Sequence, residues 1–122
     1  MAKELKQKPL VEEDGGNDWI RRGYVFRSSA YEILDFIEKN PYLGPLLRSS
    51  LRRLAFYFPH ARLSLEKICY QDSLDDQQLI VFVKPQDEIS LSQAEERFNT
   101  FEDNWWLPNL HLAKGKLCIV LE

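Results

Sequence analysis

The sequence predicts a small α+β domain with a three- to four-stranded, mainly antiparallel sheet and about three helices packed on one face. Hydrophobic residues make up 44% of the 122 residues and aromatic residues 12%, which is a globular composition. Apolar residues recur at helical spacing between residues 29 and 58 and again after residue 90. Between these segments and at the end of the chain, short apolar runs are typical of strands.

Residues 1–18 combine lysines, acidic residues, Pro9 and Gly15-Gly16 with few large apolar side chains. This composition predicts a flexible N-terminal arm, which leaves residues 19–122 as the single domain. From Trp19 to Arg27, aromatic and β-branched residues suggest a short first strand. Gly23 interrupts its alternation, so this strand is the least defined element.

Two helices are expected next. The first begins at Ser29, which forms a capping-box pattern with Glu32, and it ends at Asn40-Pro41. Asn40 then caps the second helix, which runs to about Phe58. The buried stripe predicted for the second helix is Leu43, Leu47, Leu51, Leu54 and Phe58.

Two strands follow the helices. Apolar and polar residues alternate from Ala61 to Glu66, as in a half-buried strand, and residues 71–77 form a polar turn. The continuous apolar run Leu79–Val83 predicts a central strand that is covered on both faces.

A third helix and a last strand complete the chain. Ser90 or Ser92 caps this helix, Pro108 ends it, and a loop extends through Gly115. The run Leu117–Leu121 is apolar on both faces, so we do not expect it to be an exposed edge. The amphipathic stripe predicted for the helix is Leu91, Ala94, Phe98, Phe101 and Trp105.

The resulting order is (β)ααββαβ. If the first strand is present, this order matches a ferredoxin-like arrangement with a two-part first helix. Since that arrangement supports many unrelated functions, it predicts no function by itself.

The net charge is −3, which argues against a dedicated nucleic-acid-binding protein. Residues 1–62 hold 11 Lys/Arg and 8 Asp/Glu, whereas residues 63–122 hold 5 and 11. This polarity would orient a partner or favour self-association. The alternative is that the two halves simply have different solvated faces.

Motifs of known enzymes and metal sites are missing from the sequence. No glycine-rich phosphate loop or nucleophile elbow is present, so we expect no cofactor and lean against an enzyme. Four potential ligands, His60, Cys69, His111 and Cys118, are spaced too widely to predict a metal site. Both cysteines lie in apolar runs and are expected to be reduced, buried thiols.

Trp105-Trp106-Leu107 is the main candidate for a partner-binding site. Trp105 extends the buried stripe, whereas Trp106 lies 100° further round, in line with polar residues. Its indole must therefore be covered by the following loop or be exposed to a partner. An exposed tryptophan is a typical interface anchor.

Arginines of the N-terminal half give a second candidate site. Arg48 and Arg52 lie four residues apart, with Arg53 beside them, and Arg21 and Arg22 lie near the expected first strand. Such side chains bind nucleic-acid phosphates, although solvated helix surface is the more ordinary explanation for them.

The function expected from these features is a non-catalytic protein-interaction or regulatory domain whose partner is either a second copy of the chain, giving a homodimer, or another protein. A nucleic-acid-binding module that uses the arginines is one alternative. A small ligand-binding protein or enzyme, with Glu102, Asp103 or His60 near its pocket, is the other. The charged N-terminal segment and the lack of an 18-residue apolar stretch predict a cytoplasmic protein with no secretory signal and no membrane partner.

Overall fold

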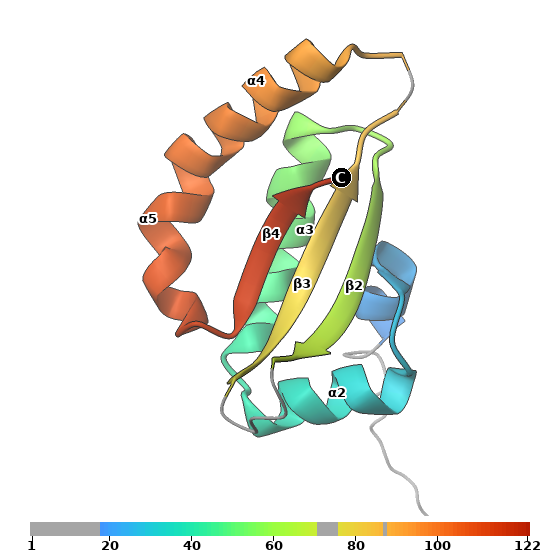
Figure 1. The fold of residues 1–122 in the computed structure, drawn as a ribbon, viewed down its shortest axis with the longest axis vertical. Coiled ribbons are helices and arrows are strands. Elements are labelled where there is room, and N and C mark those ends of the chain that lie inside the picture. Colours follow the sequence, from blue (N-terminus) through green and yellow to red (C-terminus); the bar gives the residue numbers. More distant parts are fainter. Residues whose placement is uncertain (1–17, 71–75, 87) are drawn as a thin grey trace, which may run out of the picture.

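The computed structural model describes residues 18–70, 76–86 and 88–122. Within these ranges the chain has the predicted α+β class, with one four-stranded sheet and several helices. Figure 1 shows the strands in front of α3 (Leu43–Tyr57), with α4 (Leu91–Phe101) running along the side of the sheet. In the described part of the chain, no helix has the length and apolar character needed to cross a membrane.

The sheet is mixed, and its strands lie side by side in chain order. Both outer pairings, β1–β2 and β3–β4, are parallel, and only the central β2–β3 pairing is antiparallel. The prediction of a mainly antiparallel sheet is therefore wrong. The strands are β1 (Val25–Phe26), β2 (Arg62–Cys69), β3 (Gln77–Lys84) and β4 (Leu117–Leu121).

The helical crossovers explain this pattern. Each helical crossover places the next strand directly beside the strand before it. The two strands joined in this way run parallel. In the split βαβ units of a ferredoxin-like sheet, another strand lies between the two connected strands. The ferredoxin-like arrangement is therefore not confirmed.

The first predicted strand is mostly helical. Residues 18–23 are helix, and only Val25–Phe26 pairs with the sheet. The backbone N–H of Tyr24 donates to the carbonyl of Ile20 at 2.9 Å, and both side chains are buried. Placing these two residues on one side of a helical turn buries both of them, so tertiary packing outweighs the β-propensity of the segment.

Helix α2 (Ala30–Lys39) begins where the sequence predicts, since Ser29 Oγ accepts from the backbone N–H of Glu32. Asn40 ends this helix and donates its side-chain amide to a carbonyl of the last turn. It does not cap α3, which begins at Leu43 after Tyr42. The predicted stripe of α3 is buried except for Leu51, which is half-buried.

Strand β3 is central, as predicted, but only one of its faces is in the core. Leu79, Val81 and Val83 are buried, whereas Ile80 and Phe82 on the other face are half-buried. Among the residues that the structure describes, no helix covers that face (Figure 1). The expectation of two covered faces is therefore wrong for this strand.

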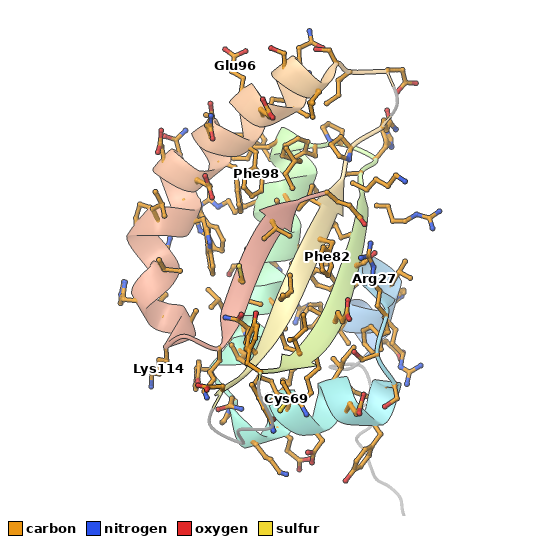
Figure 2. All side chains as sticks on the ribbon, in the orientation of Figure 1. Arg27, Cys69, Phe82, Glu96, Phe98 and Lys114 are labelled. Carbon is orange, nitrogen blue, oxygen red and sulfur yellow. The ribbon has the colours of Figure 1, made fainter. Side chains whose placement is uncertain are left out.

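Strand β4 forms an edge of the sheet in the described residues, contrary to the prediction. It pairs only with β3, and its apolar character comes from Leu117 and Ile119, which face the core. Glu122, directly after the strand, accepts two hydrogen bonds from Arg27. The guanidinium of Arg27 lies 4.2 Å from the ring centre of Phe82, so these contacts connect both edges of the sheet across the open face (Figure 2).

The third predicted helix starts at the expected cap, because Ser90 and Gln93 form a reciprocal capping box. It does not end at Pro108. A π-helix, η3 (Glu102–Trp106), continues into α5 (Leu107–Asn109) and the 3₁₀ turn η4 (Leu110–Ala113), where a loop was predicted. Pro108 lies in the first turn of α5, directly after the π-helical turn, and does not end the helix.

Candidate functional site

The outer side of α3 carries two adjoining cavities, of about 470 and 400 Å³, which share Ser49 and Trp105. We call them together the α3 groove. Its first cavity lies between the start of α3 and the segment formed by η3, α5 and η4, and its second lies further along α3. The lining residues are Tyr42, Pro45, Leu46, Ser49, Arg52, Arg53, Phe56, Trp105, Asn109, Leu112 and Lys114.

The spacing of residues along α3 creates one wall of this groove. Pro45, Ser49, Arg52 and Phe56 follow one another at intervals of four, three and four residues, so they share one side of the helix. The Phe56 side chain is 76% exposed. Its ring stands edge-on to that of Tyr57, with ring centres 5.1 Å apart. An aromatic residue is therefore presented at the surface.

The opposite wall is built on Trp105, which is 9% exposed. Its ring lies 5.8 Å from that of Phe101 and 6.0 Å from that of Trp106, measured between ring centres. The side-chain amide of Asn109 donates to the carbonyl of Trp105 at 2.7 Å, and this bond holds the turn that joins the two residues. Since these rings form part of the core, this wall of the groove is rigid.

Trp106 lies in the core, which is the covered alternative that the sequence left open. Its side chain is 3% exposed, whereas that of Leu107 is 52% exposed. A π-helical turn holds one more residue than an α-helical turn, so Trp105 and Trp106 both point inward. Of the three residues proposed for partner binding, only Trp105 lines the groove.

The structure brings Arg52 and Arg53 to the groove and places Arg48 next to it. Among the described residues, no carboxylate pairs with any of these three guanidinium groups. Arg48 lies 5.5 Å from the ring centre of Trp19, in a separate cavity of about 680 Å³ that shares Pro45 with the groove. Three predicted arginines are thus arranged along α3.

Arg21 and Arg22 lie on the neighbouring helical segment, residues 18–23, and both are exposed. The guanidinium of Arg21 lies 5.7 Å from the ring centre of Phe26. Neither arginine lines the α3 groove. The predicted arginine set therefore covers two adjacent helices and does not form one compact cluster.

The acidic pair predicted for a ligand site is not gathered with His60. His60 lines a hollow at the start of β2, and neither Glu102 nor Asp103 contributes to that hollow. Glu102 lies near Cys118, and burial together with this carboxylate raises the pKa of the thiol. Cys69 is exposed and Cys118 is half-buried, so the prediction that both thiols are buried is wrong. The described residues contain no group of three or more potential metal ligands.

Lys114 and Tyr42 form the other end of the groove. The ammonium of Lys114 lies 4.6 Å from the ring centre of Tyr42, and burial raises the pKa of the Tyr42 hydroxyl. These two residues and Phe56 were not among the site residues predicted from the sequence. Phe56 could have been found from the sequence, because this aromatic residue does not fall on the buried stripe of its helix. Lys114 depends on the turns after Pro108, which were expected to be loop, and Tyr42, just before α3, meets the groove only because those turns bring Lys114 against it.

Comparisons with models of protein families, with curated proteins and with solved structures find no match for this chain.

Proposed function

We propose that this protein is a non-catalytic protein-interaction domain that binds its partner through the α3 groove. The observation that carries the proposal is the exposed ring of Phe56 beside Arg52 and Arg53, whose guanidinium groups pair with no carboxylate in the described ranges. Aromatic residues and arginines contribute most to the binding energy of protein interfaces.

The groove offers both parts of such an interface. Trp105, Leu46 and Leu112 supply an apolar surface in which a partner side chain would lose its contact with water. Arg52 and Arg53 lie at the rim, where they would steer an acidic partner into place. Because the Trp105 wall is anchored in the core, binding would not require this wall to become ordered.

A pair of matched variants tests the proposal. Phe56→Asp places a charge in the groove, and Tyr31→Asp makes the same change on α2, where Tyr31 is 77% exposed against 76% for Phe56. We expect proteins that co-purify with the tagged chain from native extract to be lost with Phe56→Asp and retained with Tyr31→Asp. Equal recovery with both variants would show that the groove does not bind the partner. Circular dichroism of both variants provides the control for folding.

Homodimer formation is part of this proposal, with a regulatory role for the domain in the cytoplasm. If a second copy occupies the groove, sedimentation equilibrium will give a dimer mass for the wild type and for Tyr31→Asp. Phe56→Asp will then sediment as a monomer. A monomer mass for the wild type at all accessible concentrations contradicts self-association and leaves a different protein as the partner.

Nucleic-acid binding is the second candidate function, and the arrangement of Arg48, Arg52 and Arg53 along α3 favours it. Unpaired guanidinium groups bind phosphates, and an exposed ring such as that of Phe56 stacks on bases. This function predicts that affinity for single-stranded RNA falls steeply with salt. Arg52→Gln would lower the slope of log affinity against log salt by about one. No binding at low salt would eliminate this candidate.

A further inference from the structure

The turn that ends α3 holds a histidine in a conformation that favours glycine. The backbone N–H of Ala61 donates to the carbonyl of Phe58 at 3.1 Å, and His60 has φ 69°. With Pro59 in the second position and a left-handed third residue, this is the pattern of a type II β-turn, whose third position is usually glycine. A residue with a side chain is less stable than glycine in that conformation, so His60 lowers the stability of this turn.

A pair of like charges lies next to this turn. Arg62 on β2 and Lys84 on β3 are direct partners across the antiparallel pairing. Side chains in such positions start only about 4.5–5.5 Å apart, and like charges there repel each other. Both residues are exposed, and in the ranges the structure describes neither pairs with a carboxylate.

The strained histidine and the two cations line the same hollow. It has a volume of about 470 Å³, and its remaining lining residues are Pro85, Gln86 and Glu88. It lies where α3 ends and β2 begins, at the upper end of the sheet in Figure 1. Two features that each cost stability therefore lie together, and three side chains with nitrogen donors line the same hollow.

We propose that this hollow binds a small multivalent oxyanion of the phosphate type. The forked guanidinium of Arg62 can donate to two oxygens, while Lys84 and the imidazole of His60 donate to others. An anion between Arg62 and Lys84 attracts both side chains and so offsets the repulsion between them. Glu88 in the same hollow repels anions, but Arg62 and Lys84 outweigh its single charge, so a ligand with more than one negative charge gains more from this net positive site than a monovalent anion does. This site is separate from the α3 groove and does not depend on the function proposed for it.

Calorimetric titration with pyrophosphate, and with inorganic phosphate as a smaller probe, tests the site. We expect His60→Gly to raise the melting temperature, because glycine suits the turn, and to weaken pyrophosphate binding about tenfold. Lys84→Gln should weaken binding to a similar extent, whereas Glu88→Gln should strengthen it. Arg97→Gln, which removes an exposed cation from α4, is the control for net charge and should leave binding unchanged.

A single-stranded oligonucleotide, titrated in parallel, shows whether the phosphate is free or carried by a nucleic acid. Binding of either probe that is lost in His60→Gly and Lys84→Gln supports the site and assigns its source. Absence of binding by both pyrophosphate and the oligonucleotide overturns the proposal. Binding that His60→Gly and Lys84→Gln leave as strong as in the wild type also overturns it.

Discussion

The backbone N–H of Leu107 donates to the carbonyl of Glu102, five residues earlier, where an α-helix would use a residue four earlier. This wide turn brings Trp106 into the core together with Trp105. The same turn carries the helix past Pro108 and closes one wall of the α3 groove. π-helical turns occur often at functional sites, and this one contributes Trp105 to the α3 groove.

Trp106→Ala is expected to lower the free energy of unfolding by about 3–5 kcal/mol, because it empties a large buried volume. Leu107→Ala, one residue further, should change it by no more than about 0.5 kcal/mol, since Leu107 is 52% exposed. Urea denaturation followed by fluorescence measures both. A loss below about 1 kcal/mol for Trp106→Ala would mean that this indole is exposed in solution.

The buried hydroxyl of Tyr24 should make the protein less stable at alkaline pH. Its hydroxyl donates to the carbonyl of Leu47 at 2.7 Å, and burial raises the pKa of Tyr24. The unfolded chain releases this proton near pH 10, while the folded chain still holds it. The contribution of Tyr24 is therefore complete below about pH 10 and is lost as the pH rises further.

The matched variant is Tyr24→Phe, which removes both the hydrogen bond and the titrating group. At pH 7 we expect it to lower the free energy of unfolding by about 1 kcal/mol. Above pH 10 the wild type should lose stability more steeply than the variant, so the difference between them narrows. Denaturation curves for the two proteins that stay parallel from pH 7 to 11 would contradict burial of this hydroxyl.

Two glycines should respond to alanine in opposite directions. Apart from its chain neighbours, a Cβ at Gly44, in the first turn of α3, would meet only Ile37, at 4.0 Å, so Gly44→Ala should stabilise the protein, but only by about 0.5 kcal/mol, because Pro45 disfavours a helical residue with a Cβ before it. A Cβ at Gly23 would lie 2.5 Å from the side chain of Leu51. Leu51 must then move, and Gly23→Ala should destabilise the protein by about 1–3 kcal/mol. Thermal unfolding checks both, and a stabilising Gly23→Ala would mean that the segment 18–23 does not pack against α3.

The sequence predicts most elements because their signals are local. The cap at Ser29, the capping box at Ser90 and the apolar runs of β3 and β4 each depend on residues within one segment. Strand pairing depends instead on which strand each crossover reaches, and no single segment encodes this. The parallel pairings were therefore missed.

The candidate site was predicted only in part, for a related reason. Arg52, Arg53 and Trp105 belong to clear helical patterns, and the structure places them around one groove. The position of Trp106 depends on one hydrogen bond that shifts the helix by a residue, and ordinary α-helical spacing cannot anticipate it. Because Pro108 was expected to end the helix, the positions of Leu112 and Lys114, which lie beyond it, were not predicted either.

Site-specific photo-cross-linking tests the central claim most directly. A benzophenone amino acid placed at position 56 lies in the α3 groove, and the same residue at position 31 occupies an equally exposed site on α2. We predict a discrete, nuclease-resistant adduct from position 56 in native extract, reduced by Arg52→Glu, and no such adduct from position 31. Equal adducts from both positions, or an adduct from position 31 alone, would contradict a binding site in the groove.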